Sequence, residues 1–451
     1  MNTISAENTV TVDCGASFLK GALFQNGVMT RSRQLSAPLN VQADPFDPAG
    51  IKRLTEAVRD LIAELSAGLP EAAVSIANEM HGFLLADENG EPVTDYISWQ
   101  REFIGREAVQ NRLTATAGSE HAQIMLRHTG MPVRSGLPSS NLLWLVSENR
   151  LPEGKTLYFY TLGDFIVRTL TGKAPCCHLT NAAATGLCDL TVPAWNRDLI
   201  GIITGGYSGR IVFPEISSSA VQYRNGDTLL TVLPAIGDQQ AALLGSGLQS
   251  PHTVSFNMGT GAQVSRMTDS LSFGDYQLRP YFYGQYIKTV PHIPCGRALN
   301  VFFRFVRDIL RKVQPDISDA EVWRILSESA GSCTAPDAPV VSLSFFENAC
   351  EAQSGGSISE IGEYGLTPES LMTGVICRMA QNFAEAAGRL LGRTEPEITS
   401  VVFSGGIAAR WPVLREQIIR RTGLEVPVTV SDSDTMYGCL RYAELSCPQA
   451  G

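Results

Sequence analysis

The residue types best suited to chemistry in this 451-residue chain lie in Gly237-Asp238-Gln239-Gln240 and, shortly after it, in Asn257-Met258-Gly259-Thr260-Gly261. An alcohol is a poor nucleophile at neutral pH, so its attack on phosphorus needs a carboxylate that accepts the hydroxyl proton. Asp238 is suited to that task, and the glycine turn that follows is suited to binding phosphate oxygens. A base followed by a phosphate turn predicts phosphoryl transfer to a hydroxyl.

The elements around Asp238 place it at a strand-to-helix junction. An apolar strand over 232–236 precedes it, and Ala241 to Leu244 begin a helix. The helix dipole favours negative charge at this end, so we expect the carboxylate to be ionised. The alternative is that Asp238 is only an N-cap residue.

Residues 9–24 predict a strand, a glycine turn and a second strand. The backbone amides of such a turn, near Gly15, can bind phosphate oxygens, while Ser17 adds a hydroxyl and Lys20 a positive charge. Asp13 can hold Mg²⁺ through water, because this ion keeps much of its hydration. An ordinary turn is the alternative.

The strand, turn and strand pattern occurs again at 254–266, which hints at an internal duplication. Near the C-terminal end, a buried-type strand at 400–403 is followed by Gly405 and Gly406 and then by helical spacing. Glycines at such a junction let a planar ligand approach the backbone closely. A simple turn is again the alternative for this pair.

Six motifs together resemble one family over nearly the whole chain. They are Asp13-x-Gly15-x-Ser17-x-x-Lys20, Met80-His81-Gly82, Trp99, Gly237-Asp238-Gln239-Gln240, Gly259-Thr260-Gly261 and Ser404-Gly405-Gly406. Their order and approximate spacing resemble those of the FGGY carbohydrate kinases. The resemblance implies an α/β fold of two actin-like, ribonuclease H-like domains with a cleft between them. It implies a sugar-binding domain with the catalytic base at 1–245 and a nucleotide-binding domain at 246–451.

The resemblance also implies a role for each matching residue, with ATP and Mg²⁺ as cofactors. Asp238 matches the catalytic base, and Asp13 and Asp238 lie beside the metal. The residues matching the ATP-binding positions are Gly15, Ser17, Lys20, Gly259, Thr260, Gly261, Gly405 and Gly406. Those matching the sugar-binding positions are Met80, His81, Trp99, Asp238 and Gln239. The alternative for His81 is an imidazole without a ligand, but a strand at 74–77 delivers it to a strand end, where α/β proteins place their sites.

Within the family, the chain looks most similar to the sedoheptulokinases. The expected reaction is therefore phosphorylation of a terminal hydroxyl of a ketose, with sedoheptulose ahead of xylulose or ribulose. A glycerol or polyol kinase and a non-catalytic sugar-binding homologue are the alternatives. Three residues depart from the family pattern: Ala16 replaces a threonine, Arg101 stands where an acidic residue is common, and Asn348 stands where an arginine often follows Glu347.

Composition agrees with this interpretation. The chain has 45 acidic and 35 basic residues and a formal net charge of −10, which disfavours nucleic acid and anionic membranes as partners. With no signal sequence or spanning segment evident, we expect a cytoplasmic protein whose partners are a sugar and ATP, and a homodimer is allowed. Apolar spacing predicts a helix over 47–65, residues 118–150 look irregular, and the domain junction is expected near 245–250.

Overall fold

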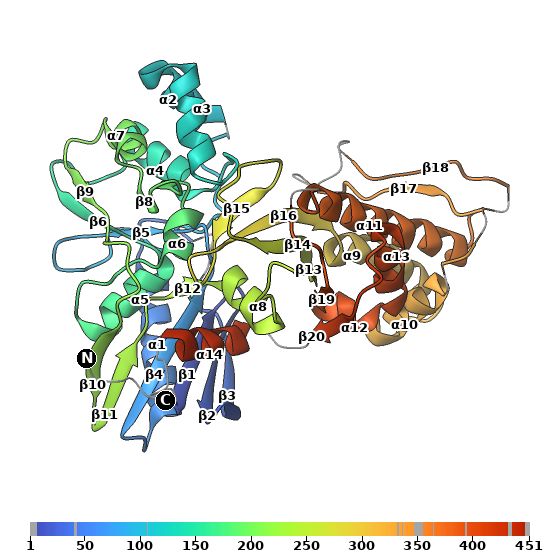
Figure 1. The fold of residues 1–451 in the computed structure, drawn as a ribbon, viewed down its shortest axis with the longest axis horizontal. Helices are drawn as coiled ribbons and strands as arrows, with labels where there is room; N and C mark the ends of the chain where they lie inside the picture. Colours follow the sequence, from blue (N-terminus) through green and yellow to red (C-terminus); the bar gives the residue numbers. More distant parts are fainter. Residues whose placement is uncertain are drawn as a thin grey trace.

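The computed structural model describes residues 7–39, 43–105, 107–331, 333–335, 337–346, 355–363, 365–392, 395–431 and 435–446. Figure 1 shows two lobes side by side along the long axis, each built on a sheet with helices packed against it. The expected α/β class is confirmed. Asn348 lies outside the described residues.

The first lobe is built on a seven-stranded sheet in the order β10-β11-β4-β1-β2-β3, with β12 also paired to β4. Its strands are β1 (Asn8–Cys14), β2 (Phe18–Gln25), β3 (Val28–Ser36), β4 (Glu71–Asn78), β10 (Val221–Asn225), β11 (Thr228–Val232) and β12 (Ile236–Gly237). β1 and β4 are buried almost throughout because both faces of the sheet are covered. Helix α1 (Ala49–Ser66), close to the expected helix, contributes Leu54, Val58 and Leu61 to this core.

The second lobe is built on a six-stranded sheet in the order β15-β16-β14-β13-β19-β20. Its strands are β13 (Thr253–Met258), β14 (Gly261–Thr268), β15 (Gln277–Pro280), β16 (Tyr286–Pro294), β19 (Ser400–Ser404) and β20 (Val428–Ser431). Its helices are α9 (Gly296–Leu310), α10 (Asp319–Ala330), α11 (Pro368–Leu390), α12 (Gly406–Arg410) and α13 (Pro412–Thr422). In its core, the Phe256 ring of β13 contacts both Phe403 of β19 and Phe383 of α11.

The two sheets repeat one pattern. β1 pairs antiparallel with β2 and parallel with β4, and β13 pairs antiparallel with β14 and parallel with β19. Both predicted strand, turn and strand units are therefore present. Because the carboxyl ends of parallel strands meet at one edge, each sheet collects its turns and polar residues there.

Helix α14 (Thr435–Ser446) returns to the first lobe. It packs on α8 (Asp238–Ser246) and against β1 and β4. The approach is close: a Cβ at Gly438 would lie 1.8 Å from the carbonyl oxygen of Ala241. Cys439 and Tyr442 of α14 join a core that includes Leu244 of α8 and Met267 of β14. One apolar cluster thus spans both lobes.

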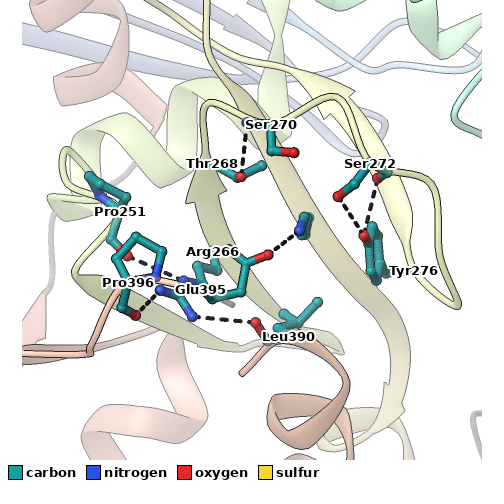
Figure 2. Close-up of polar contacts among 10 residues, drawn as sticks. Pro251, Arg266, Thr268, Ser270, Ser272, Tyr276, Leu390, Glu395 and Pro396 are labelled. Atoms are coloured by element: carbon teal, nitrogen blue, oxygen red, sulfur yellow. Dashed lines mark hydrogen bonds and ion pairs between the residues drawn. The ribbon is translucent and has the colours of Figure 1, made fainter. Parts of the chain in front are cut away.

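A buried arginine ties the outer part of the second lobe to its sheet. Figure 2 shows Arg266 of β14 directing its guanidinium at backbone carbonyl oxygens. Nε donates to Pro251 at 3.2 Å, one Nη donates to Leu390 at 3.4 Å, and the other donates to Pro396. Since Arg266 is only 1% exposed, these acceptors offset the desolvation of its charge.

The upper part of the first lobe corrects one expectation. Residues 118–150 were expected to be irregular but contain helices α3 (Ser119–His128) and α4 (Pro138–Ser147). α3 buries only Ala122 and Met125, and α4 is buried on nearly all sides, so neither shows a clear apolar stripe. The remaining elements are α2 (Glu107–Ala117), α5 (Leu162–Thr171), α6 (Leu179–Ala184), α7 (Arg197–Thr204), β5 (Leu84–Ala86), β6 (Thr156–Tyr160), β7 (Cys188–Asp189), β8 (Ala194–Trp195), β9 (Arg210–Val212), β17 (Val340–Ser342) and β18 (Ser357–Ser359).

Candidate active site

A cavity of about 520 Å³ lies between the lobes and takes walls from both sheets. Eight of the residues predicted from the sequence line it: Asp13, Gly15, Met80, His81, Trp99, Asp238, Gln239 and Gly261. Ten residues to which the sequence analysis gave no role in the site also line it: Glu79, Arg134, Ala242, Asn257, Ala262, Gln263, Arg279, Pro291, His292 and Thr435.

Strand register explains how the first lobe builds its wall. β1 and β12 both pair parallel with β4, with Cys14 and Gly237 each opposite Asn78. Glu79 directly follows β4 and Asp238 directly follows β12, so the two carboxylates emerge beside each other. Adjacent parallel strands therefore deliver them to one edge.

Asp238 is the first residue of α8, whose N-cap is Gly237 without a side-chain cap. The alternative that Asp238 is only an N-cap residue is therefore wrong. Its Oδ1 accepts a hydrogen bond from the backbone N–H of Gln239 at 2.8 Å. This contact orients the carboxylate while the side chain remains on the cavity wall.

The expectation that the helix dipole keeps Asp238 ionised needs correction. Burial, and after it the charge of Glu79, raise the pKa of Asp238 to about 7, against the weaker opposing effects of the Gln239 amide and Arg279. Desolvation and a like charge together outweigh the dipole. The carboxyl is thus poised between its acid and base forms near neutral pH.

Glu79 is the principal carboxylate that sequence reasoning missed. It is 6% exposed, and it accepts a hydrogen bond from Ser98 Oγ. Burial raises its pKa, while the Ser98 hydrogen bond lowers it. Its position directly after the buried strand β4 was the available signal, since the same strand end supported the prediction of His81.

His81 lines the cavity with a fixed ring. Its backbone has φ of +64°, and its Nδ1 lies 2.7 Å from the carbonyl oxygen of Ala184. Because a carbonyl only accepts, Nδ1 carries the proton and donates it. Burial, followed by the charges of Arg279 and Arg134, holds the pKa of His81 well below its usual value. The neutral ring then keeps Nε2 as an acceptor.

Two glutamines and two arginines form the rest of this wall. Gln239 Nε2 donates to Gln263 Oε1 at 2.7 Å, and Arg279 donates to Gln239 and to Gln277. The Arg134 guanidinium lies over the Trp99 ring, 5.7 Å from its centroid. Trp99 is 39% exposed, so part of its ring remains open to the cavity.

The glycine turns lie at the carboxyl ends of the strands of the second lobe. Asn257 and Ser404 are paired in the sheet, and Asn257 Nδ2 donates to Ser404 Oγ at 3.0 Å. A Cβ at Gly405 would lie 2.6 Å from the Met258 carbonyl oxygen and 3.1 Å from the Gly259 nitrogen. The turn at Gly259 and the turn at Gly405 therefore touch each other.

Not every predicted residue reaches the cavity wall. Ser17, Lys20, Gly259, Thr260, Gly405 and Gly406 are absent from the described lining. Lys20 Nζ lies 3.8 Å from Asp13 Oδ2, which links it to the wall through that carboxylate. Of the departures from the family pattern, Ala16 is exposed, and the Arg101 guanidinium donates to the Ala43 carbonyl, away from the described lining.

The donor set suits a nucleotide-bound Mg²⁺. Asp13 and Asp238 both present carboxylates to the cavity. Mg²⁺ commonly takes one or two carboxylates together with substrate phosphates and water, rather than a cage made only of protein ligands. The described residues contain no group of three or more His, Cys, Asp or Glu side chains that could hold a metal. Among the same residues, no helix combines the length and hydropathy that crossing a membrane requires.

Comparison with known proteins gives one family and a set of similar folds. Residues 9–245 match the model described as "FGGY family of carbohydrate kinases, N-terminal domain". The chain is 32% identical over 231 residues to a glycerol kinase of Methylorubrum populi, which covers 48% of this chain and 44% of that relative. The chain thus aligns with less than half the length of this curated relative.

Two solved structures superpose over nearly the whole chain. A gluconate kinase from Lactobacillus acidophilus has a TM-score of 0.77 and 19% identity, and covers 98% of this chain and 89% of its own. A xylulose kinase from Rhodospirillum rubrum has a TM-score of 0.78 and 16% identity, and the superposition covers 98% of this chain and 91% of the xylulose kinase. The fold is that of two actin-like, ribonuclease H-like domains, as the sequence resemblance implied.

Proposed function

Because this chain belongs to the FGGY family of carbohydrate kinases, we propose that it transfers the γ-phosphate of ATP to a terminal hydroxyl of a polyhydroxylated acceptor. The observation that carries the proposal is the position of Asp238. Its carboxyl, with a pKa of about 7, lines an interlobe cavity that also takes in Gly15 and Gly261 from the two glycine turns. A base and phosphate-binding backbone thus border one space.

The reaction follows from these groups. The acceptor oxygen attacks the γ-phosphorus, the bond from that phosphorus to the β,γ-bridging oxygen breaks, and ADP leaves. Asp238 accepts the hydroxyl proton during the attack. Amides of the glycine turns near Gly15 and Gly261 bind phosphate oxygens, and Lys20, held near Asp13, adds positive charge. Asp13 and Asp238 would hold Mg²⁺, which would neutralise part of the phosphate charge.

The acceptor is placed against the first lobe. The open part of the Trp99 ring provides an apolar surface for C–H groups, and His81 Nε2 provides a hydrogen-bond acceptor for a hydroxyl. Met80 and Gln239 complete this part of the wall. A ketose, with sedoheptulose first and xylulose, ribulose and glycerol behind it, remains the prediction from sequence.

The other finer predictions are part of the same proposal. The proposed boundary between the two domains lies at 245/246. Helix α14, although it belongs to the second domain by sequence, packs on the first lobe. A cytoplasmic location fits a reaction that consumes ATP, and a homodimer stays a prediction. A non-catalytic sugar-binding protein is less favoured, since the cavity combines the Asp238 carboxyl with Gly15 and Gly261 of the two glycine turns.

Acceptor-dependent ADP release tests the proposal. We expect the purified protein with MgATP to release ADP in the presence of one class among polyols, pentuloses, heptuloses and sugar acids, and to be nearly silent without an acceptor. A coupled ADP assay measures this. ADP release that is equal with and without every acceptor would reject the kinase assignment.

The rate should depend on pH through Asp238. With a pKa of about 7, the base form falls about tenfold between about pH 8 and about pH 6, and kcat/KM should fall with it. The same raised pKa contributes stability below the pKa of an unfolded aspartate, about 4, and that contribution is lost as the pH rises through 7. As the pH rises from about 6 to about 8, kcat/KM should therefore increase while the melting temperature decreases. A kcat/KM that does not change with pH would contradict this prediction.

A further inference from the structure

Two arginines line the cavity from opposite lobes. Arg279 lies on β15, whose Leu278 N–H donates to the Gly130 carbonyl of the first lobe at 2.9 Å, so this strand reaches across the cleft. Arg134 lies in the loop between α3 and α4. Both are on the cavity wall, and Arg279 is only 6% exposed.

The loop that carries Arg134 is held in place. Ser140 Oγ donates to the Arg134 carbonyl at 2.9 Å. A Cβ at Gly136 would lie 2.1 Å from the Trp99 carbonyl oxygen, so the loop backbone packs directly on the Trp99 segment. With its guanidinium stacked on the Trp99 ring, Arg134 is positioned before any ligand arrives.

Arg266 shows what a structurally satisfied arginine looks like in this protein. Its Nε and both Nη atoms donate to backbone carbonyl oxygens (Figure 2). Arg279, by contrast, uses its two Nη atoms on the neutral amides of Gln239 and Gln277, and its buried Nε has no partner. The buried Nε of Arg134 also has none.

The charge of this pair is only partly balanced. Among the described residues, no ion pair joins either guanidinium to a carboxylate, although the charge of Asp238 raises the pKa of Arg279 and that of Glu102 raises the pKa of Arg134. Burial, followed by the charge of Arg134, lowers the pKa of Arg279 to about 9. Burial and then the same two arginines lower the pKa of His292 to about 4. Cationic groups thus face one another around one space, which is unfavourable until an anion enters it.

We infer that the acceptor carries a carboxylate, as an aldonate does, bound between Arg134 and Arg279 while its far terminal hydroxyl reaches Asp238. This inference rests on the proposed function and names its substrate class. A planar carboxylate matches the forked N–H donors of a guanidinium. A neutral ketose would bring no negative charge to balance the two guanidinium groups, so the arginines select the acid over the neutral sugar of the same length.

The first test compares two matched ligands, gluconate and glucitol, which differ by a carboxylate in place of a hydroxymethyl group. We expect kcat/KM to favour gluconate by about 10²-fold or more, as expected when a site loses a charged partner. Sedoheptulose and glycerol 3-phosphate complete the panel. Equal or better use of glucitol or sedoheptulose overturns the inference, and preference for glycerol 3-phosphate overturns the carboxylate assignment.

Calorimetric binding separates this inference from the kinase proposal. We expect gluconate to bind more tightly than glucitol whether or not ADP is released. Absent ADP release with preserved gluconate binding would reject the kinase and keep the anion site. Equal binding of both ligands, with ADP release intact, would keep the kinase and reject the anion site.

The second test changes Arg134. We expect Arg134→Gln to raise KM for gluconate by about 30-fold or more, to raise KM for glucitol much less, and to leave KM for ATP unchanged, so that the ratio of kcat/KM for gluconate to that for glucitol falls. Arg134→Lys should keep part of the preference for gluconate over glucitol, because the positive charge is kept. Arg112→Gln, at an exposed position on α2, is the control and should change nothing. A rise in KM for ATP instead would assign Arg134 to the nucleotide and overturn the inference, and thermal unfolding confirms that each variant is folded.

Discussion

Asp238→Asn should lower kcat by about 10²-fold or more while acceptor and MgATP still bind. The amide has nearly the size of the carboxyl and can keep the hydrogen bond from the Gln239 N–H through its oxygen. It cannot accept the hydroxyl proton, so the loss falls on the chemical step. Because the charge of Glu79 raises the pKa of Asp238, removing this carboxylate also relieves repulsion, and the melting temperature near pH 8 should be unchanged or higher.

Steady-state kinetics with separate values of kcat and KM check this result. Asp227→Asn is the matched control, since that residue lies in the exposed turn between β10 and β11 and should leave kinetics unaltered. Near-normal turnover by Asp238→Asn would remove the proposed base. A raised KM with unchanged kcat would assign Asp238 to acceptor binding alone.

Gly405→Ala should raise KM for ATP by about tenfold or more and lower the melting temperature. Gly405 has φ of +90°, a conformation that a side chain disfavours, and its added Cβ would meet the Met258 carbonyl and the Gly259 nitrogen. The backbone of the glycine turn after β13 must therefore shift to make room for the added Cβ. The change therefore displaces the proposed phosphate-binding amides.

Gly423→Ala separates the effect of the disfavoured backbone conformation from the effect of the clash with the glycine turn. Gly423 ends α13 in the same lobe with φ of +68°, and a Cβ there would meet nothing within 4 Å. It should lose about 1 kcal/mol of stability from the backbone conformation and keep its KM for ATP. An equal KM for ATP in both variants would show that the Gly405 turn does not touch the nucleotide.

Much of the site could be predicted because its signals are local. Asp13, His81, Asp238 and Gly261 each stand directly beside or after a short apolar run, and parallel strands bring such ends together. Glu79 also directly follows a buried strand, but the sequence analysis assigned the sugar-binding role to the adjacent Met80 and His81 and gave Glu79 none. The roles assigned to these residues stay predictions.

The arginines could not be found in this way. Arg279 sits within a strand, where a lone charge is usually solvated at an edge, and Arg134 sits in a segment expected to be irregular. Both reach the cavity only through contacts between residues distant in the chain, such as Leu278 with Gly130. The raised pKa of Asp238 could not be predicted either, because it depends on burial and on the charge of Glu79, which is distant in the chain.

The packing of α14 has a consequence for how the protein is made. Cys439 and Tyr442, near the end of the chain, close a core around α8, whose own residues are synthesised much earlier. A nascent chain that has emerged only as far as the second sheet would leave the apolar face around Ala241 and Leu244 bare. The lobe that holds the base thus reaches its final packing only after residues 435–446 have been synthesised.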